Sequence, residues 1–512
     1  MNVNSVISKT LKHEHVVSSF EGKHEQKPII EYSVGMANVV IVDINGRGYY
    51  IVEEPKLSNE AIKAYNFIIE YLYKYLKPSQ TSQDPASLIE TYMWKAAKDA
   101  KFEDILEREY AALRYYVLRD TIGYGKLDVL MRDVNIEEIA VEGPSIPVAV
   151  VHREASEYRW LNTNIVFYSE NELRSYVQRL ALKGGKSIST ANPIVEVKLP
   201  EGHRVALTYS REVSGRGSSL VIRKFPEKPL TITHLTSSNT LSLLMAAYLW
   251  RLIEAQQLIF IIGPMASGKT TVLQALTSLI PPDCRVITVE DTPELNLHHE
   301  HWDPLYTRRS IGKYGDYDIT LEDLVKFAWR RRAEYLIVGE VRGEEVKALV
   351  QAAASGHGGL TTFHSDNVES MILRLQSPPL EVKESFLSTI SSVVVMRRVR
   401  RAGKTVRRVV EISEIIPSKS IGITFRKIFK WNPTIDKHEP SSIEELINIS
   451  VKLKDICERE GITVSEMIED LRLKLDFLKS LVEREIYEYV EIAKEISKYY
   501  YGKGLNHEGI YR

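Results

Sequence analysis

The stretch that most constrains the fold is LIFIIGPMASGKTTVLQAL, which spans residues 258–276. It begins as a short apolar run typical of a buried strand and ends as a helical pattern. Between the two, Gly263, Gly268, Lys269 and Thr270 follow the spacing G-x-x-x-x-G-K-T. That spacing between a strand and a helix is typical of a phosphate-binding loop. Because both flanking elements fit, the sequence predicts a nucleotide site.

The parts of this loop have separate expected roles. Backbone N–H groups of the loop and of the following helix N-terminus surround the phosphates. Lys269 is expected to reach the β- and γ-phosphates of ATP, and the Thr270 hydroxyl is expected to hold Mg²⁺. The predicted nucleotide-binding residues are Gly263, Pro264, Met265, Ala266, Ser267, Gly268, Lys269, Thr270 and Thr271. Kinases, GTPases, helicases and motors share such a loop, so it leaves the use of the nucleotide open.

Acidic residues end two further strand-like runs. VITV is followed by Glu290, with Glu294 a short turn later, and YLIV is followed by Gly339 and Glu340. Ligands of parallel sheets lie at the carboxyl ends of the strands, where a carboxylate can hold Mg²⁺ or orient the attacking water. Many P-loop ATPases carry an aspartate where this chain has Gly339. The metal is therefore assigned to Thr270 and Glu340, and the water activator stays open among Glu290, Glu294 and Glu340.

Two histidines, His357 and His364, lie in the polar, glycine-rich segment SGHGGLTTFHSDN. The glycines indicate tight turns, which allow side chains to approach the phosphates closely. We expect His357 to contribute to nucleotide binding and His364 to act in catalysis by sensing the γ-phosphate.

Composition narrows the setting of the protein. The chain of 512 residues suggests about three domains, and its net charge of −1 gives no overall field that would recruit nucleic acid or anionic lipid. Cys284 and Cys457 form no metal-ligand pattern and suit buried thiols in a reducing compartment. The first residues lack the apolar core of a signal peptide, and the longest apolar candidate, 241–250, is about half the length of a membrane span. We expect a cytoplasmic protein with peripheral contact at the inner face of the membrane.

The pattern along the chain predicts several segments. A turn at Asn45-Gly46 joins two strands within 39–54, helices follow at 57–76 and 84–100, and an antiparallel meander occupies 194–225. Strands and helices then alternate as in a parallel sheet covered by helices. The expected organisation is a mobile arm at 1–30, an α+β domain at 31–224, a linker at 225–235, an α/β ATPase domain at 236–438 and a helical region at 439–512.

The order GPMASGKT, VEDTPEL, IVGEVRGEE and SGHGGLTTFHSD resembles the Walker A, Asp-box, Walker B and His-box series of secretion and pilus ATPases. The resemblance covers roughly residues 190–415. GEVRGEE and KFPEKPLTI look closest to the archaeal branch, which contains the ATPase of the archaeal flagellum and its pilus relatives. Ala333 and Glu334 depart from the family, where Pro and Asp are common. The resemblance implies a RecA-like P-loop ATPase domain preceded by a smaller α+β domain.

In that family, arginines of the N-terminal domain reach the nucleotide. GHRVAL and VIRKF match the two arginine strands, which nominates Arg204 and Arg223, with Arg211 and Arg216 as nearby substitutes. A guanidinium suits this role because its planar fork matches phosphate oxygens. ATP would then bridge two domains across the linker.

The resemblance implies an ATP-hydrolysing homo-hexamer that powers assembly, and with it rotation, of the archaeal flagellum. Its implied partners are a polytopic membrane platform protein and accessory flagellar proteins. An archaeal type IV pilus or secretion ATPase is the alternative, since the phosphate motifs do not distinguish what is assembled. A purely structural nucleotide switch would leave Glu290, Glu294 and Glu340 unexplained.

A nucleic-acid translocase is a further alternative, supported only by the basic stretch MRRVRRAGKTVRRVVEI at 396–412. The stretch alternates like an exposed hairpin turning at Ala402-Gly403 and lacks stacking aromatic residues, so nucleic acid is not the expected partner. The Tyr-rich end, 496–512, suits an interface, but composition leaves its role open.

Overall fold

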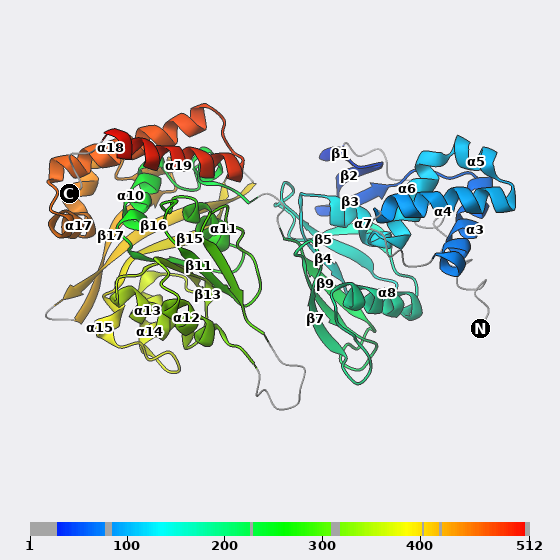
Figure 1. The fold of residues 1–512 in the computed structure, drawn as a ribbon, viewed down its shortest axis with the longest axis horizontal. Coiled ribbons are helices and arrows are strands. Elements are labelled where there is room, and N and C mark those ends of the chain that lie inside the picture. Colours follow the sequence, from blue (N-terminus) through cyan, green and yellow to red (C-terminus); the bar gives the residue numbers. More distant parts are fainter. Residues whose placement is uncertain are drawn as a thin grey trace. The chain divides into compact units, whose positions relative to one another are not determined.

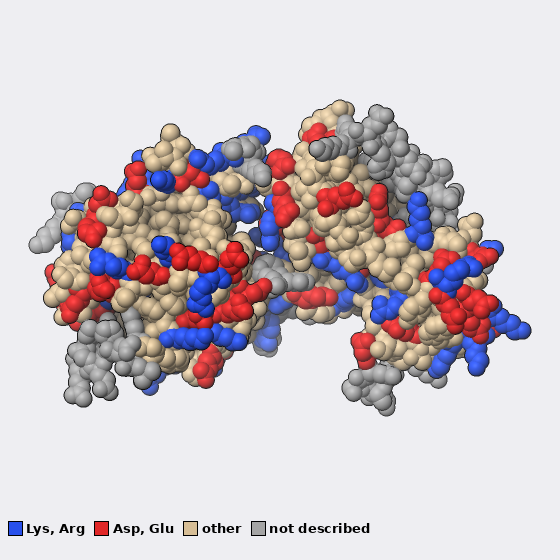
Figure 2. Space-filling view, turned by 90° about the horizontal axis from the view of Figure 1, so that it is seen from above, with Lys and Arg blue, Asp and Glu red and all other residues tan. Residues whose placement is uncertain are grey.

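The computed structural model describes residues 28–76, 84–225, 229–308, 318–401, 404–418 and 422–506. The chain divides into two compact units, which we call the N-terminal unit (Met1–Glu227) and the C-terminal unit (Lys228–Arg512) (Figure 1). The expected arm at 1–30 falls almost entirely outside the described residues, as does the turn at 402–403. On the face drawn in Figure 2, acidic and basic side chains are interspersed, in keeping with the net charge of −1.

Strands of the described part of the N-terminal unit form one sheet in the order β1-β2-β3-β6-β5-β4-β9-β8-β7. The turn at Asn45 and Gly46, with φ of 55° and 78°, joins β2 to β3 as expected, because positive φ at both residues matches the twist of a hairpin. The meander β7-β8-β9 is also confirmed. The strands are β1 Ile30–Val34, β2 Ala37–Ile44, β3 Arg47–Glu53, β4 Ile136–Val141, β5 Pro147–His152, β6 Leu161–Val166, β7 Ile194–Lys198, β8 Arg204–Thr208 and β9 Ser219–Arg223.

Helices of this unit form two groups. Those within residues 59–121 enclose an apolar cluster of their own, which includes Ile68, Met93 and Leu113, whereas α7 packs on β4 and α8 packs on β7, β8 and β9 (Figure 1). Side chains of Ser58, Asp84 and Ser169 cap three of the helix N-termini. The helices are α3 Asn59–Tyr75, α4 Pro85–Ala100, α5 Glu103–Arg108, α6 Tyr110–Thr121, α7 Asp128–Arg132 and α8 Glu170–Lys183, with a 3₁₀ turn at Gly125–Leu127.

The C-terminal unit is built on a second sheet, ordered β12-β11-β13-β14-β10-β15-β16-β17-β18. The strands from β12 to β15 are parallel, as expected, and those from β15 to β18 are antiparallel, so the sheet is mixed. The α/β fold class is confirmed, with an antiparallel extension beside the strand that leads into the phosphate loop. The strands are β10 Leu258–Ile262, β11 Val286–Glu290, β12 Trp302–Tyr306, β13 Tyr335–Val341, β14 Gly358–Phe363, β15 Ile390–Arg401, β16 Lys404–Ser418, β17 Gly422–Asn432 and β18 Lys437–Glu439.

Helices cover both faces of this sheet (Figure 1). One face carries α12 Leu321–Arg330, α13 Glu345–Ala354, α14 Val368–Gln376 and α15 Glu384–Leu387. The other carries α9 Ile232–Ser237, α10 Leu243–Glu254, α11 Lys269–Thr277, α16 Ile443–Ile449, α17 Lys452–Glu460, α18 Val464–Glu483 and α19 Tyr489–Asn506. Although the family's proline is missing at 333, α12 still ends at Arg330, and Arg332 has a left-handed φ of 55°.

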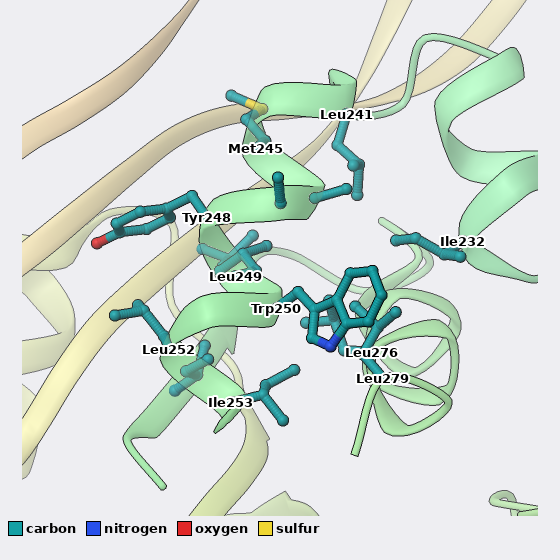
Figure 3. Packing of buried hydrophobic residues seen from close by; sticks show 14 of the residues in the cluster. Ile232, Leu241, Met245, Tyr248, Leu249, Trp250, Leu252, Ile253, Leu276 and Leu279 are labelled. Atoms are coloured by element: carbon teal, nitrogen blue, oxygen red, sulfur yellow. The ribbon is translucent and has the colours of Figure 1, made fainter. Parts of the chain in front are cut away.

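The C-terminal helices pack directly on α10 and α11. Trp250 of α10 lies against Leu276 and Leu279 in the core, where Ile232 and Leu241 also gather (Figure 3). Its indole N–H donates to Tyr500 Oη at 2.7 Å, and Tyr500 donates to the Leu279 carbonyl at 3.0 Å. Tyr499 and Tyr500 of the Tyr-rich end therefore pack against this core. Within the described residues, no helix is long and apolar enough to cross a membrane.

Candidate nucleotide site

The phosphate loop joins β10 to α11, and its glycines are required by the backbone. Gly263 has φ of 153°, and a Cβ there would lie 2.4 Å from the carbonyl oxygen of Met396 on β15. Gly268, with φ of 92°, occupies the N-cap of α11. Ser267 is buried and Met265 is exposed, while Thr270 and Thr271 lie half-buried in the first helical turn. The expected strand–loop–helix is confirmed.

Lys269 is folded over this loop. Its side chain is only 7% exposed, and its ammonium donates to the carbonyls of Gly263 and Pro264 at 3.0 Å each. It also lies 3.3 Å from His364 Nδ1. These hydrogen bonds hold the ammonium at the place where the loop would surround phosphates.

His364 connects Lys269 to Glu340. Because an ammonium only donates hydrogen bonds, His364 Nδ1 accepts, which leaves the proton on Nε2. That Nε2 lies 2.8 Å from Glu340 Oε1. Burial, followed by the charge of Lys269, lowers the pKa of His364, which favours this neutral form. The structure thus links the loop, the strand end of β14 and the strand end of β13 in one chain of polar contacts.

Arg342 completes this chain on the far side of Glu340. Its Nε and Nη2 bind the two carboxylate oxygens at 2.8 and 2.6 Å. Burial alone would raise the pKa of Glu340, but the hydrogen bonds and charge of Arg342 outweigh it and lower the pKa. Hydrogen bonding to Glu340 is also the main cause of the raised pKa of Arg342, with smaller contributions from the charges of Asp291 and Glu294. The charges of acids at both predicted strand ends therefore act on one guanidinium.

Glu290 is buried at the end of β11. Its Oε1 accepts the backbone N–H groups of Glu294 and Leu295 at 2.9 and 3.0 Å, which fixes the turn that carries Glu294. A Cβ at Gly339 would lie 3.0 Å from Glu290 Cγ and 3.2 Å from Oε1. The residue before Glu340 is a glycine because Glu290, on the neighbouring strand, fills the adjoining space.

His357 does not join this group. It precedes β14, whereas His364 follows it, so the two histidines bracket a strand that is about 20 Å long. His357 Nδ1 contacts the carbonyl of Ala333, and its ring lies edge-on to Trp329. Ala333 precedes β13 as His357 precedes β14, so both residues lie at the amino edge of the sheet, away from His364. The expected contact of His357 with nucleotide is therefore wrong within the C-terminal unit.

Arg204 and Arg223 belong to the N-terminal unit. They are direct partners in the pairing of β8 with β9, so their side chains share one face of that sheet. Arg216 pairs with Glu142 at 3.1 Å, and Arg211 is exposed. The two nominated arginines thus form one cationic pair.

Sequence reasoning missed several arginines near the loop, among them Arg342 and Arg374. Arg342 stands two residues after Glu340 in GEVRGEE, and that spacing on a strand would have placed both on one face. Arg374 of α14 donates to the carbonyl of His364 and lies over the ring of Phe363. A hollow of about 250 Å³ beside the loop is lined by Gly263, Pro264, His364, Ser365, Asp366, Ser370 and Arg374.

Comparisons with known proteins agree with these features. Residues 126–461 match the family described as Type II/IV secretion system protein. An uncharacterized protein of Methanocaldococcus jannaschii is 37% identical over 393 residues, which cover 76% of this chain and 70% of that protein. A putative conjugal transfer protein of Mycobacterium tuberculosis is 32% identical over 42% of this chain and 62% of its own length.

Among solved structures, the Yersinia pseudotuberculosis ATPase DotB aligns over 74% of this chain and 93% of that chain, with 15% identity and a TM-score of 0.41. The family match covers well over half of the chain and includes the phosphate loop, both acidic strand ends and His364. The chain belongs to the type II/IV secretion system protein family.

Proposed function

We propose that this protein hydrolyses ATP and is a ring-forming motor that powers assembly and rotation of the archaeal flagellum. The observation that carries the proposal is the contact chain Lys269–His364–Glu340–Arg342, which joins the Walker A, His-box and Walker B segments in one site. The archaeal form of the GEVRGEE and linker segments supports the flagellar assignment over a bacterial role. The similarity to a protein of an archaeon agrees with it.

Hydrolysis uses residues of the C-terminal unit. The helix N-terminus and loop amides bind the phosphates, and Lys269 leaves the Gly263 and Pro264 carbonyls to meet the β- and γ-phosphates. The oxygen donors of Thr270 and Glu340 suit Mg²⁺, which prefers hydroxyl, carboxylate and phosphate oxygens. Bound Mg²⁺ would neutralise charge that develops on the phosphates.

The contacts of Glu290, Glu294 and Glu340 guide our choice of the residue that activates the attacking water. Glu290 Oε1 is committed to two backbone N–H groups, which suits an anchor for the 291–295 turn. Glu340 is also bound, by Arg342 and by His364 Nε2, and the charges of Glu294 and Glu340 both act on Arg342, so we keep these two as the candidates that orient water. We propose Glu340 as the residue that activates water and Glu294 as the second candidate. His364 senses the γ-phosphate through Lys269.

Motion would come from the N-terminal unit. Arg204 and Arg223 supply a cationic pair that can bind the γ-phosphate, and hydrolysis would remove that contact. In a homo-hexamer the resulting movement would act on a polytopic membrane platform protein with accessory flagellar proteins, placing the ring peripherally at the inner face of the membrane.

A pilus or secretion role is the second candidate, favoured by the similarity to a putative conjugal transfer protein. A pull-down distinguishes the two candidates: tagged protein is mixed with native membranes and ATP, and the proteins that it captures are identified. Glu340→Gln should trap the ATP-bound ring and retain platform proteins, and Lys269→Ala is the matched control that cannot. Capture of flagellar components supports the proposal, capture of a pilus or secretion platform replaces it, and an ATPase strongly stimulated by single-stranded DNA would favour translocation instead.

A further inference from the structure

The basic hairpin β15–β16 supports the phosphate loop directly. β15 pairs in parallel with β10, the strand that leads into the loop. At Gly268 an added Cβ would lie 3.1 Å from Arg407 Cδ and 3.6 Å from the methyl carbon of Met396. Two glycines of the loop, Gly263 and Gly268, therefore face this hairpin, and one of them faces an arginine.

Arg407 also binds the loop. Its Nε donates to the carbonyl oxygen of Ala266 at 3.3 Å. Ala266 has a left-handed φ of 58°, a conformation that a residue with a Cβ adopts at a cost. A contact that holds this peptide also fixes the direction of the neighbouring backbone N–H groups, which are those that would surround the phosphates.

The alternation of the hairpin separates two kinds of arginine. Arg407 pairs with Arg398 across the strands, and Met396 pairs with Val409 on the same face, where both pack in the cluster that contains α11. The side chain of Arg408 lies on the opposite face of the hairpin and is buried. Its guanidinium binds the Asp436 carboxylate at 3.0 and 3.1 Å. These bonds hold the pKa of Asp436 well below its usual range.

Arg408 thus anchors the hairpin, and its neighbour Arg407 reaches the loop. The Asp436 carboxylate is additionally bound by Trp431 at 2.8 Å and by Arg401 at 3.0 Å, so the hairpin is tied to the β17–β18 segment. These contacts hold the strand segment next to Arg407 in place as Arg407 approaches the loop. Much of the basic character of 396–412 therefore serves contacts within this unit.

We propose that Arg407 is a positioning residue for nucleotide: it holds the turn at Ala266 so that the loop amides are oriented for the phosphates, and its charge adds to the field there. It acts through the loop and from the same chain that carries Lys269. The inference rests on the ATPase activity of this loop and is independent of which filament or platform the motor serves.

The test is steady-state ATPase kinetics and ADP titration on the full chain, with Arg407→Ala and Arg407→Gln. Loss of one charge-assisted hydrogen bond should raise KM for ATP and Kd for ADP by about tenfold, with kcat changed less than threefold. Arg407→Lys should recover part of the affinity, because an ammonium can still donate to the carbonyl. A merely structural role would instead lower the melting temperature and leave affinity unchanged.

Arg398→Ala is the matched control, since it removes the same charge from the paired position on the same face, and nucleotide affinity should change less than threefold. If Arg407→Ala and Arg398→Ala weaken binding equally, general charge explains the effect and the positioning role is overturned. If neither Arg407 variant weakens binding while the wild type hydrolyses ATP, the inference also fails. A wild type without ATPase activity would instead refute the function itself.

Discussion

Replacing Gly339 with aspartate, the residue that many P-loop ATPases carry there, should destabilise the C-terminal unit. Any Cβ at 339 would lie 3.0 Å from Glu290 Cγ and 3.2 Å from its Oε1. Glu290 is 2% exposed, and its Oε1 is held by the N–H groups of Glu294 and Leu295, so moving it away would break those bonds. The perturbation is therefore both steric and electrostatic.

The two parts have different sizes. Gly339→Ala adds only the methyl group, and overpacking of this kind costs about 1–3 kcal/mol. Aspartate adds a second carboxylate, and two like charges about 4 Å apart repel by about 4 kcal/mol at an effective dielectric constant near 20. We expect Gly339→Asp to lower the free energy of unfolding by about 5–7 kcal/mol.

Urea unfolding of the full chain, followed by circular dichroism, measures these differences. In a Glu290→Ala background both steric and charge conflicts disappear, so Gly339→Asp should then cost less than about 1 kcal/mol, which gives a large coupling in the double-mutant cycle. The introduced aspartate would have a raised pKa in the folded state. Its penalty relative to Gly339→Ala should therefore shrink as the pH falls through that pKa, because the folded form takes up the proton first.

Two results would refute this reasoning. One is an equal cost of Gly339→Asp with and without Glu290, which would place the conflict elsewhere. The other is a Gly339→Asp protein as stable as wild type, because the space beside Glu290 would then be larger than the structure shows.

Further predictions concern other members of the site and core. Lys269→Ala should reduce turnover to background, since the β/γ-phosphates lose their cation, as a phosphate-release assay will measure. Glu340→Gln should bind ATP with near-native affinity but hydrolyse it at least about 100-fold more slowly; full turnover would reject its role. His364→Gln should flatten the acid limb of the pH–rate profile: burial and the charge of Lys269 lower the pKa of His364, so it is neutral at neutral pH, and its protonation in acid would repel Lys269. Glu414→Ala should lower the free energy of unfolding by about 3–5 kcal/mol, because this buried carboxylate accepts from Tyr248, Ser450, Val451 and Lys452; exposed Glu458→Ala is the control and should change it little.

Much of the site could be predicted because its signals are local. The apolar run before Gly263 and the acids at 290 and 340 mark strand ends, and parallel strands bring such ends to one edge of the sheet. The same rule explains the failure at His357. GGLTTF is itself a buried strand, so a residue before it lies at the opposite edge from His364. Reading that strand from the sequence would have separated the two histidines.

The sequence indicates a helical region at 439–512, and in the structure Trp250, Tyr500 and Leu279 join these helices to α10 and α11. Helical periodicity shows that a helix has an apolar face and does not say which surface covers it. Lys474 illustrates the difference: it is fully buried and paired with Asp470 and Glu254, an arrangement that depends on packing between α18 and α10.

The sequence by itself determined the chemistry of this protein: a phosphate loop between a strand and a helix, acids at two strand ends, and the motif order of a secretion ATPase. These follow from short spacings and from backbone conformations that only glycine adopts easily. The tertiary structure decided which side chains meet. It put Glu290 against Gly339, His364 between Lys269 and Glu340, and Arg407 on the phosphate loop. Such contacts join residues far apart in the chain, and they depend on strand order and register, which no local pattern encodes.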